Sequence, residues 1–345
     1  MRIATLQFNP QVGQIAANFS RAESLLMREE REGVLRDLDL LVLPELAFTG
    51  YNHPSLSAIA PYLEPTAAGP STRWAARTAL RLKCTVAVGY PEAAEEGNFN
   101  TAYDAKITAE EGTVAYNALV IVDSTGEVVA HYRKSFLYYT DETWAQEGQG
   151  FFAGVLPMGA AGHRMKAVAG ICMDINPYKF EAPWTAYEFA NHARESRAKI
   201  VILSMAWLTH LTADDLAEQV MLPDTSTVGY WAERFRPLMN STTGADDEVI
   251  IVCANRVGIE GTCPRIGQVK YAGSSCVFSM MKGQDVRIWD ISGRSQEGVL
   301  LVDTNNRPGF SIAPQEKAET IGGPMDGQTQ AAVDQAAEQK PASDD

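Results

Sequence analysis

The sequence predicts a mixed α/β domain in which two β-sheets pack against each other. Three observations support this fold class. Short β-branched runs alternate with longer helical patterns, about twelve runs have the length and composition of strands, and hairpin-like pairs occur late in each half. So many strands fit two packed sheets better than one very wide sheet.

The elements follow in order along the chain. Strands are expected at 3–8, 40–44, 84–90, 103–108, 118–123, 128–133, 166–171, 200–204, 249–254, 273–279, 286–290 and 298–302, and helices at 17–32, 71–82, 184–197 and 228–240. In the first helix, Ala22, Leu25 and Leu26 share one face. Ser71, after a Gly-Pro pair, is the expected N-cap of the second. Residues 123–126 predict a turn between two strands.

Composition sets the domain boundary and excludes some partners. The net charge of -14 argues against a nucleic-acid partner and against an anionic membrane surface, since both require clustered cations. One domain is expected at 1–312, followed by an acidic tail at 313–345 with too little apolar surface to fold. Residues 208–227 form an irregular insertion, which is either a loop that shapes specificity or a solvated surface excursion.

Five cysteines and the N-terminal residues predict a cytoplasmic location. The cysteines form no Cys-x-x-Cys pair and no zinc-finger spacing, which fits a reducing compartment. Cys84, Cys253 and Cys276 lie in β-like runs and are expected to be core thiols, whereas Cys263 lies in a Gly/Pro-rich loop. The chain begins directly with a strand-like run, and we expect neither a signal peptide nor a membrane span.

Three polar residues follow apolar strands and could carry chemistry. Cys172 ends the run that begins at Ala167, before a turn and a helical pattern that opens near Pro183, so it is a candidate nucleophile; the alternative is a small core thiol. Glu45 follows an apolar strand and could serve as a general base or as a salt-bridged cap. Lys134 follows another strand, where a solvent-facing lysine is the alternative.

Together these residues form an ordered set that resembles the nitrilase, or carbon–nitrogen hydrolase, superfamily. The resemblance runs from Arg2 to about Pro308 and includes the segments 253–261 and 271–275. It implies a four-layer α-β-β-α sandwich of the nitrilase type. It also implies a catalytic triad of Glu45, Lys134 and Cys172. A supporting fourth acid is expected at Glu142, although the adjacent Asp141 is also possible.

Within the superfamily, three stretches (6–13, 133–138 and 170–183) look like the fungal protein N-terminal asparagine/glutamine amidases. This implies deamidation of N-terminal Asn or Gln to Asp or Glu, a step that feeds the N-degron pathway. Many other amidases of the superfamily have an arginine where Asn176 stands. An arginine suits a free carboxylate, so Asn176 disfavours free amino acids as substrates.

The amino end of a peptide carries an α-ammonium group, which carboxylates would bind. Asp174, Asp141 and Asp214 are candidates, with the alternative that Asp174 only braces the turn after the cysteine. Tyr51 and Trp207 are further substrate-binding candidates.

The implied mechanism needs no metal and no organic cofactor. The Cys172 thiolate attacks the carboxamide, and Lys134 and the Met173 N–H hold the oxyanion. The main alternative is a general ω-amidase or nitrilase that acts on small-molecule amides. A papain-like enzyme that uses His192 or His210 and a catalytically inactive scaffold relative are less favoured. Preference for Asn or Gln, and monomer or homodimer, stay open.

Overall fold

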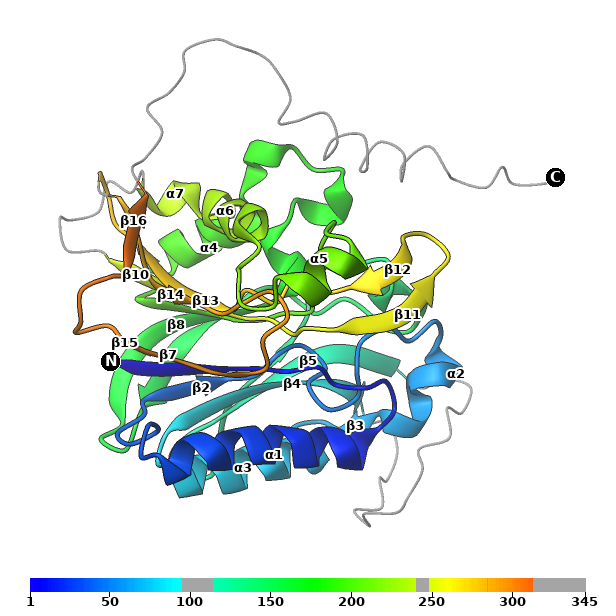
Figure 1. Ribbon diagram of the computed structural model, residues 1–345, viewed down its shortest axis with the longest axis horizontal. Coiled ribbons are helices and arrows are strands. Elements are labelled where there is room, and N and C mark those ends of the chain that lie inside the picture. The colour runs from blue at the N-terminus through cyan, green and yellow to red at the C-terminus, as the bar shows by residue number, and fades with distance from the viewer. Residues whose placement is uncertain (95–113, 240–247, 284, 313–345) are drawn as a thin grey trace, which may run out of the picture.

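The computed structural model describes residues 1–94, 114–239, 248–283 and 285–312 (Figure 1). The strand expected at 103–108 and the tail expected at 313–345 lie outside the described residues, as does the last residue of the helix expected at 228–240.

Helices and strands interleave as the sequence predicts. The strands are β1 (Arg2–Gln7), β2 (Leu40–Val42), β3 (Glu64–Pro65), β4 (Thr85–Ala94), β5 (Val114–Val122), β6 (Val128–Arg133), β7 (Phe152–Met158), β8 (His163–Ile171), β9 (Ile200–Ser204), β10 (Val249–Ala254), β11 (Ile259–Cys263), β12 (Gly267–Lys270), β13 (Cys276–Met280), β14 (Val286–Ile291), β15 (Gly298–Asp303) and β16 (Phe310–Ile312). The helices are α1 (Ile15–Arg31), α2 (Leu56–Ile59), α3 (Pro70–Leu82), α4 (Glu188–Glu195), α5 (Ala213–Glu218), α6 (Thr225–Arg234) and α7 (Arg236–Met239).

Two large sheets organise the strands. The first has the order β15-β1-β2-β4-β5-β6, with β3 beside β4, and the second has the order β16-β14-β13-β10-β9-β8-β7. In each sheet three central strands run parallel, β1, β2 and β4 in the first and β8, β9 and β10 in the second. Most of the remaining neighbours pair antiparallel, and β11 and β12 form a separate hairpin.

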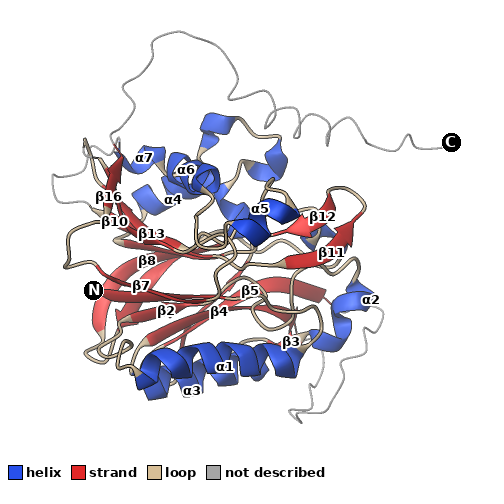
Figure 2. Ribbon diagram, viewed as in Figure 1, coloured by secondary structure: helices blue, strands red, loops and turns tan. Residues whose placement is uncertain are grey.

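The layers form the four-layer sandwich expected from the sequence. Helices α1 and α3 cover the outer face of the first sheet, and α4, α6 and α7 cover the second (Figures 1 and 2). Side chains alternate across the strands, as the two-residue period requires. In β1, Ile3 joins the core that both sheets share, whereas Ala4 and Leu6 pack against α1 residues such as Leu25. The predicted fold class is confirmed.

The sequence missed elements where glycine and proline interrupt the β pattern. Strand β7 contains Gly154 and Pro157 and is nevertheless the edge strand beside β8. An edge position tolerates a residue that has no N–H to donate. The Gly/Pro-rich loop that holds Cys263 is the β11–β12 hairpin. The prediction of Ser71 as an N-cap is wrong: Gly69 is the cap, because Pro70 takes the first helical position.

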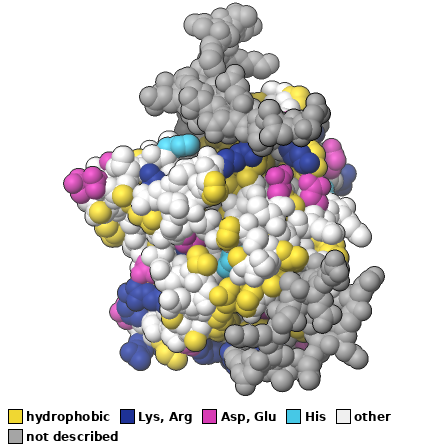
Figure 3. All heavy atoms as spheres, turned by 90° about the vertical axis from the view of Figure 1, so that its right-hand side faces the viewer, with side chains coloured by type: hydrophobic (Ala, Val, Ile, Leu, Met, Phe, Trp, Pro, Cys, Tyr) yellow, Lys and Arg dark blue, Asp and Glu magenta, His cyan; other side chains and the backbone are white. Residues whose placement is uncertain are grey.

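The helix expected at 184–197 is divided by a break. Residues Trp184–Ala186 form a 3-10 turn, Tyr187 adopts a left-handed conformation (φ 45°), and α4 follows. The insertion at 208–227 contains α5, whose N-cap is Thr212, and the start of α6, whose N-cap is Asp224. Among the described residues, no helix is both long and apolar enough to cross a membrane. On the face that carries α2, β11 and β12, hydrophobic side chains lie among polar ones (Figure 3).

Candidate active site

The ends of three strands bring Glu45, Lys134 and Cys172 together. Glu45 lies three residues after β2, Lys134 directly follows β6 in the same sheet, and Cys172 directly follows β8 in the other sheet. The Lys134 Nζ donates to Glu45 Oε1 at 2.6 Å. The charges of Glu45 and Lys134 both act on the Cys172 thiol. The three predicted residues therefore share one buried centre between the sheets.

Three donors surround the carboxylate of Glu45, which is fully buried. Its Oε1 accepts from Lys134 Nζ and from Asn117 Nδ2 at 2.7 Å, and its Oε2 accepts from the Ala206 N–H at 2.9 Å. Burial raises the pKa of Glu45 to about 7, although the Lys134 cation opposes this shift. A carboxylate whose pKa lies near neutrality is suited to accept and return a proton.

Lys134 lies between two carboxylates. Its side chain is fully buried, and its Nζ donates to Glu45 and to Asp141 Oδ2, both at 2.6 Å. Burial opposes the charge, but Asp141 and Glu45 outweigh it and raise the pKa of Lys134 above its usual value. The lysine is therefore a fixed cation at the centre of the site.

The structure places Asp141, and not Glu142, against this lysine. Asp141 is fully buried, and its Oδ2 also accepts from the Tyr138 N–H at 3.0 Å. Glu142, the residue favoured from the sequence, is exposed. The two residues begin the 3-10 turn Asp141–Thr143, where neighbouring side chains point in different directions. The spacing after Lys134 could not separate them.

Cys172 lies on a strained turn. It has φ 42° and opens the 3-10 turn Cys172–Ile175 directly after β8. A left-handed conformation costs a non-glycine residue about 1–2 kcal/mol, so the surrounding contacts must hold it. Burial raises the pKa of the thiol well above its usual value, against the opposing effects of Lys134 and of the Ala206 N–H. Burial therefore favours the thiol form of the sulfur over the thiolate.

Asp174 braces that turn and is not available to a ligand. Its Oδ2 accepts from the Ile171 N–H at 2.7 Å and from the Tyr132 hydroxyl at 2.8 Å. Its Oδ1 accepts from the N–H groups of Ser135 at 3.1 Å and Phe136 at 2.9 Å. The carboxylate is fully buried. It joins the nucleophile turn to the chain that follows Lys134, as the alternative interpretation of Asp174 expected.

The other predicted ligand-binding residues lie at different depths. Asn176 is buried, and its Oδ1 accepts from the Tyr230 hydroxyl at 2.6 Å. Tyr51 is buried, with its ring centroid 5.7 Å from Lys134 Nζ. Trp207 is half-buried and follows Ala206, which donates to Glu45, while its ring packs on Tyr230. Asp214 is exposed in the first turn of α5, so the structure does not bring it into the buried centre.

Met173 stands next to Cys172 in the 3-10 turn, where the sequence placed an oxyanion donor. The first N–H groups of any helix lack intrahelical acceptors, so this position leaves a backbone donor beside the nucleophile.

Sequence reasoning missed Asn117, which ties the two carboxylates together. Its Nδ2 donates to Glu45 at 2.7 Å and to Asp141 Oδ1 at 3.0 Å, and its carbonyl accepts from the Lys134 N–H at 2.8 Å. The available signal was one amide inside the apolar run Val114–Val122. A buried amide needs hydrogen-bond partners, and here the partners are the charged residues of the site.

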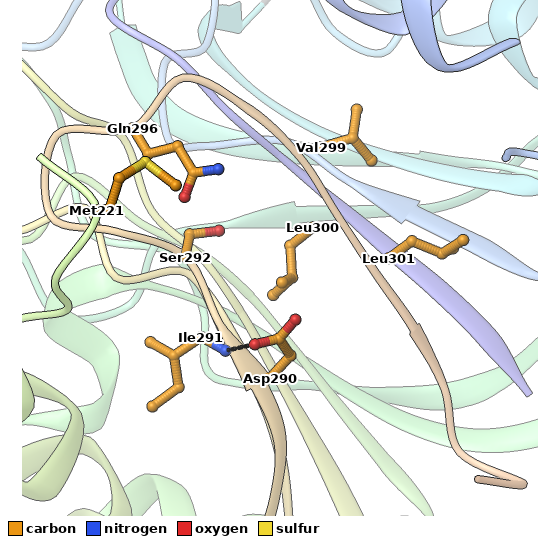
Figure 4. A pocket seen from close by; sticks show the side chains of 8 residues that line it. All are labelled: Met221, Asp290, Ile291, Ser292, Gln296, Val299, Leu300 and Leu301. Carbon is orange, nitrogen blue, oxygen red and sulfur yellow. Dashed lines mark hydrogen bonds between the residues drawn. The ribbon is translucent and has the colours of Figure 1, made fainter. Parts of the chain in front are cut away.

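One cavity in the described part of the chain belongs to another region. It has a volume of about 310 Å³ and lies beside β14 and β15 (Figure 4). Its lining consists of Met221, Asp290, Ile291, Ser292, Gln296, Val299, Leu300 and Leu301. None of the candidate catalytic residues belongs to this lining, so the cavity is separate from the buried centre.

Comparison with known proteins places the sequence in a family. The carbon–nitrogen hydrolase family model matches residues 2–177. The chain is 32% identical over 316 residues to the protein N-terminal amidase of Schizosaccharomyces pombe, a match that covers 87% of this chain and 98% of that protein. It is 28% identical over 228 residues to the protein N-terminal amidase of Saccharomyces cerevisiae, covering 62% of this chain and 46% of that protein.

Solved structures share the fold. A crystal structure of an N-terminal amidase with an Asn-Glu peptide superposes with a TM-score of 0.73 at 22% identity, covering 87% of this chain and 96% of that chain. A complex of an N-terminal amidase with a Gln-Gly peptide gives a TM-score of 0.72 at 21% identity, with the same coverage. The family model and the S. pombe relative establish the family, and the solved structures show the same fold. The chain therefore belongs to the carbon–nitrogen hydrolase family, and it is a hydrolase that acts on carbon–nitrogen bonds of amides.

Proposed function

We propose that this hydrolase removes the side-chain amide of an N-terminal Asn or Gln from peptides or proteins, which releases ammonia and leaves Asp or Glu. The observation that carries the proposal is the 32% identity to the S. pombe protein N-terminal amidase across 98% of that protein. We also propose that the products are N-termini for the N-degron pathway, which the family resemblance of the sequence implies.

The chemistry around the nucleophile supports a substrate without a free α-carboxylate. Asn176 offers a neutral amide, and its oxygen already accepts from Tyr230. Residue 176 is therefore not itself a cation that would hold a free carboxylate, whereas a peptide bond needs none. The oxygens of Asp174 and Asp141 already accept hydrogen bonds within the protein, so neither carboxylate is assigned to the α-ammonium group.

In the proposed mechanism, Glu45 acts as the general base. Its carboxylate takes the proton from the Cys172 thiol as the sulfur attacks the side-chain carbonyl carbon. Burial raises the pKa of the Cys172 thiol and so disfavours a preformed thiolate. The mechanism therefore has Glu45 remove the proton while the sulfur attacks. The Lys134 ammonium and the Met173 N–H then hold the oxyanion of the tetrahedral intermediate. Asp141 and Asn117 hold Lys134 and Glu45 in place.

Two further proton transfers complete the cycle. Protonated Glu45 gives its proton to the departing amide nitrogen, which leaves as ammonia while a thioester remains on Cys172. Glu45 then takes a proton from water, whose oxygen attacks the thioester carbonyl. The carbon–sulfur bond breaks, the acid is released, and the proton returns to the Cys172 sulfur. Each step uses groups of this chain and water alone.

Ammonia release distinguishes this function from a general amidase. Peptides that begin with Asn or Gln should be hydrolysed faster than free asparagine, free glutamine and short aliphatic amides. Cys172→Ala should abolish release from every substrate. Equal or higher kcat/KM on the free amides would replace the proposal with the small-molecule amidase alternative.

We also propose that the enzyme works in the cytoplasm on N-termini of other proteins. All five cysteines are free, which suits a reducing compartment.

A further inference from the structure

A buried cluster outside the catalytic residues involves Arg256, Glu260 and Tyr271, which we call the Glu260 network. Arg256 is fully buried, and its Nη1 donates to the Glu260 carboxylate. Its Nη2 donates to the Pro10 carbonyl at 2.8 Å, and its guanidinium lies 4.0 Å from the Tyr271 ring centroid. The Tyr271 hydroxyl donates to Glu260 Oε2 at 2.5 Å. These residues belong to the two late segments that resemble the family, but the proposed mechanism does not use them.

The Glu260 network forms hydrogen bonds with the segment that carries Tyr51. Glu260 Oε2 accepts from the Tyr51 N–H at 3.1 Å and from the Asn52 N–H at 3.0 Å. The Glu260 carbonyl accepts from Asn52 Nδ2 at 2.8 Å. Gly50 has φ 76°, and a Cβ on it would lie 2.7 Å from Glu260 Oε1, so glycine permits this approach of carboxylate to backbone. Two consecutive N–H groups therefore share one carboxylate.

Tyr51 is the point at which this segment meets the catalytic residues. Its side chain is buried, and its ring centroid lies 5.7 Å from Lys134 Nζ. Burial and the charges of Asp141, Glu45 and Cys172 raise the pKa of the phenol well above its usual value. Burial therefore favours the neutral phenol, on a ring that lies beside the Lys134 ammonium.

Burying an ion pair is costly, and an apolar cluster of the same size would stabilise the fold at least as well. Stability alone therefore does not explain why the Glu260 carboxylate binds the N–H groups of residues 51 and 52. Positioning of the Tyr51 side chain would explain it, because small displacements of a group that contacts the substrate reduce reaction rates strongly.

We propose that the Glu260 network positions Tyr51 for the reaction, and that the Tyr51 hydroxyl hydrogen-bonds to the substrate carboxamide beside Lys134 and Cys172. Glu260, Arg256 and Tyr271 act through Tyr51 and are positioning residues. The inference rests on the proposed function only for the identity of the amide substrate.

A double-mutant cycle tests this inference. Glu260→Gln would leave Arg256 without its anionic partner and risks unfolding, so the decisive variant is Tyr271→Phe, which removes one hydroxyl and keeps the ion pair. Tyr51→Phe should lower kcat/KM about 10-fold, and Tyr271→Phe about 3-fold, on the scale of single hydrogen bonds. In the Tyr51→Phe background, Tyr271→Phe should cost less than about 1.5-fold, because its effect passes through the missing hydroxyl.

Glu64→Gln is the matched control, because Glu64 is a buried carboxyl that accepts from Ser71 and lies outside the site. It should change the pH dependence of the urea midpoint without changing kcat/KM, which separates stability from positioning. Two results would overturn the inference: full multiplication of the two losses in the double variant, or unchanged kcat/KM in Tyr51→Phe. If the wild type hydrolyses only small amides, the proposed function fails, but the same cycle on those amides still decides the inference.

Discussion

Replacing Asp141 with Asn should reduce activity strongly, because Asp141 is one of the two carboxylates that hold Lys134. The lysine donates to Glu45 and Asp141 at 2.6 Å each, and all three side chains are fully buried. The substitution keeps the shape but removes one charge-assisted hydrogen bond, worth about 1.5–3 kcal/mol. If the transition state loses the same amount of stabilisation, kcat/KM falls about 10- to 150-fold.

The pH profile of the same variant provides a second readout. Activity needs the Glu45 carboxylate, so wild-type kcat/KM should fall as pH decreases through about 7. Burial is the main cause of this high pKa, and the Asp141 charge raises it further. Asp141→Asn should therefore move the acidic limb to lower pH.

Steady-state ammonia release across a pH series measures both effects, with Glu142→Gln as the control. Glu142 is exposed beside Asp141, so its substitution should leave kcat/KM within about twofold. A larger loss in Glu142→Gln than in Asp141→Asn would refute the assignment, as would an acidic limb that does not move in Asp141→Asn.

Three further predictions concern stability, each measured by urea unfolding. Burial raises the pKa of Glu64 from 4.5 to about 7. Glu64 therefore contributes fully to the free energy of unfolding below pH 4.5, and this contribution is lost as pH rises through about 7. Glu64→Gln should make the free energy of unfolding fall less steeply over this pH range. Cys172 has φ 42°, so Cys172→Gly should be about 1 kcal/mol more stable than Cys172→Ala, with both inactive. Arg234 donates to the carbonyls of Ile175 at 2.7 Å and Trp184 at 2.6 Å; Arg234→Met should cost about 3 kcal/mol by leaving both unpaired.

Each stability prediction has a contradicting outcome. An unchanged slope of stability against pH between 4.5 and 7 would show that Glu64 does not titrate as its burial requires. Equal stability of the Gly and Ala variants at 172 would mean that the turn carries no strain. Retention of wild-type stability in Arg234→Met would show that other donors or water satisfy the two carbonyls.

The sequence predicted the parts of the site that depend on where strands end. Glu45, Lys134 and Cys172 each follow an apolar run, and the carboxyl ends of such runs meet between the sheets of this fold. The strand pattern and the family resemblance both pointed to Glu45, Lys134 and Cys172 as candidates. The contacts among these three side chains depend on the order of the strands in the sheets, which local sequence patterns do not specify.

The remaining site depends on contacts between distant segments. Asp174 binds the N–H groups of Ser135 and Phe136, which lie 39 and 38 residues away in the chain. From sequence alone it could equally have been a ligand for an ammonium group. Asn117 was missed because an amide in a strand reveals its role only when its partners, Glu45 and Asp141, are known.

The central claim is that the enzyme deamidates an Asn or Gln that carries a free α-amino group. The most direct test follows deamidation by mass in peptides that begin with Asn, Gln, acetyl-Asn and Gly-Asn but are otherwise identical. The account predicts conversion of the Asn and Gln peptides and none of the acetylated or Gly-extended ones. Comparable conversion of the acetyl-Asn peptide would contradict recognition of the α-ammonium group, and conversion of the Gly-Asn peptide would contradict the restriction to N-termini.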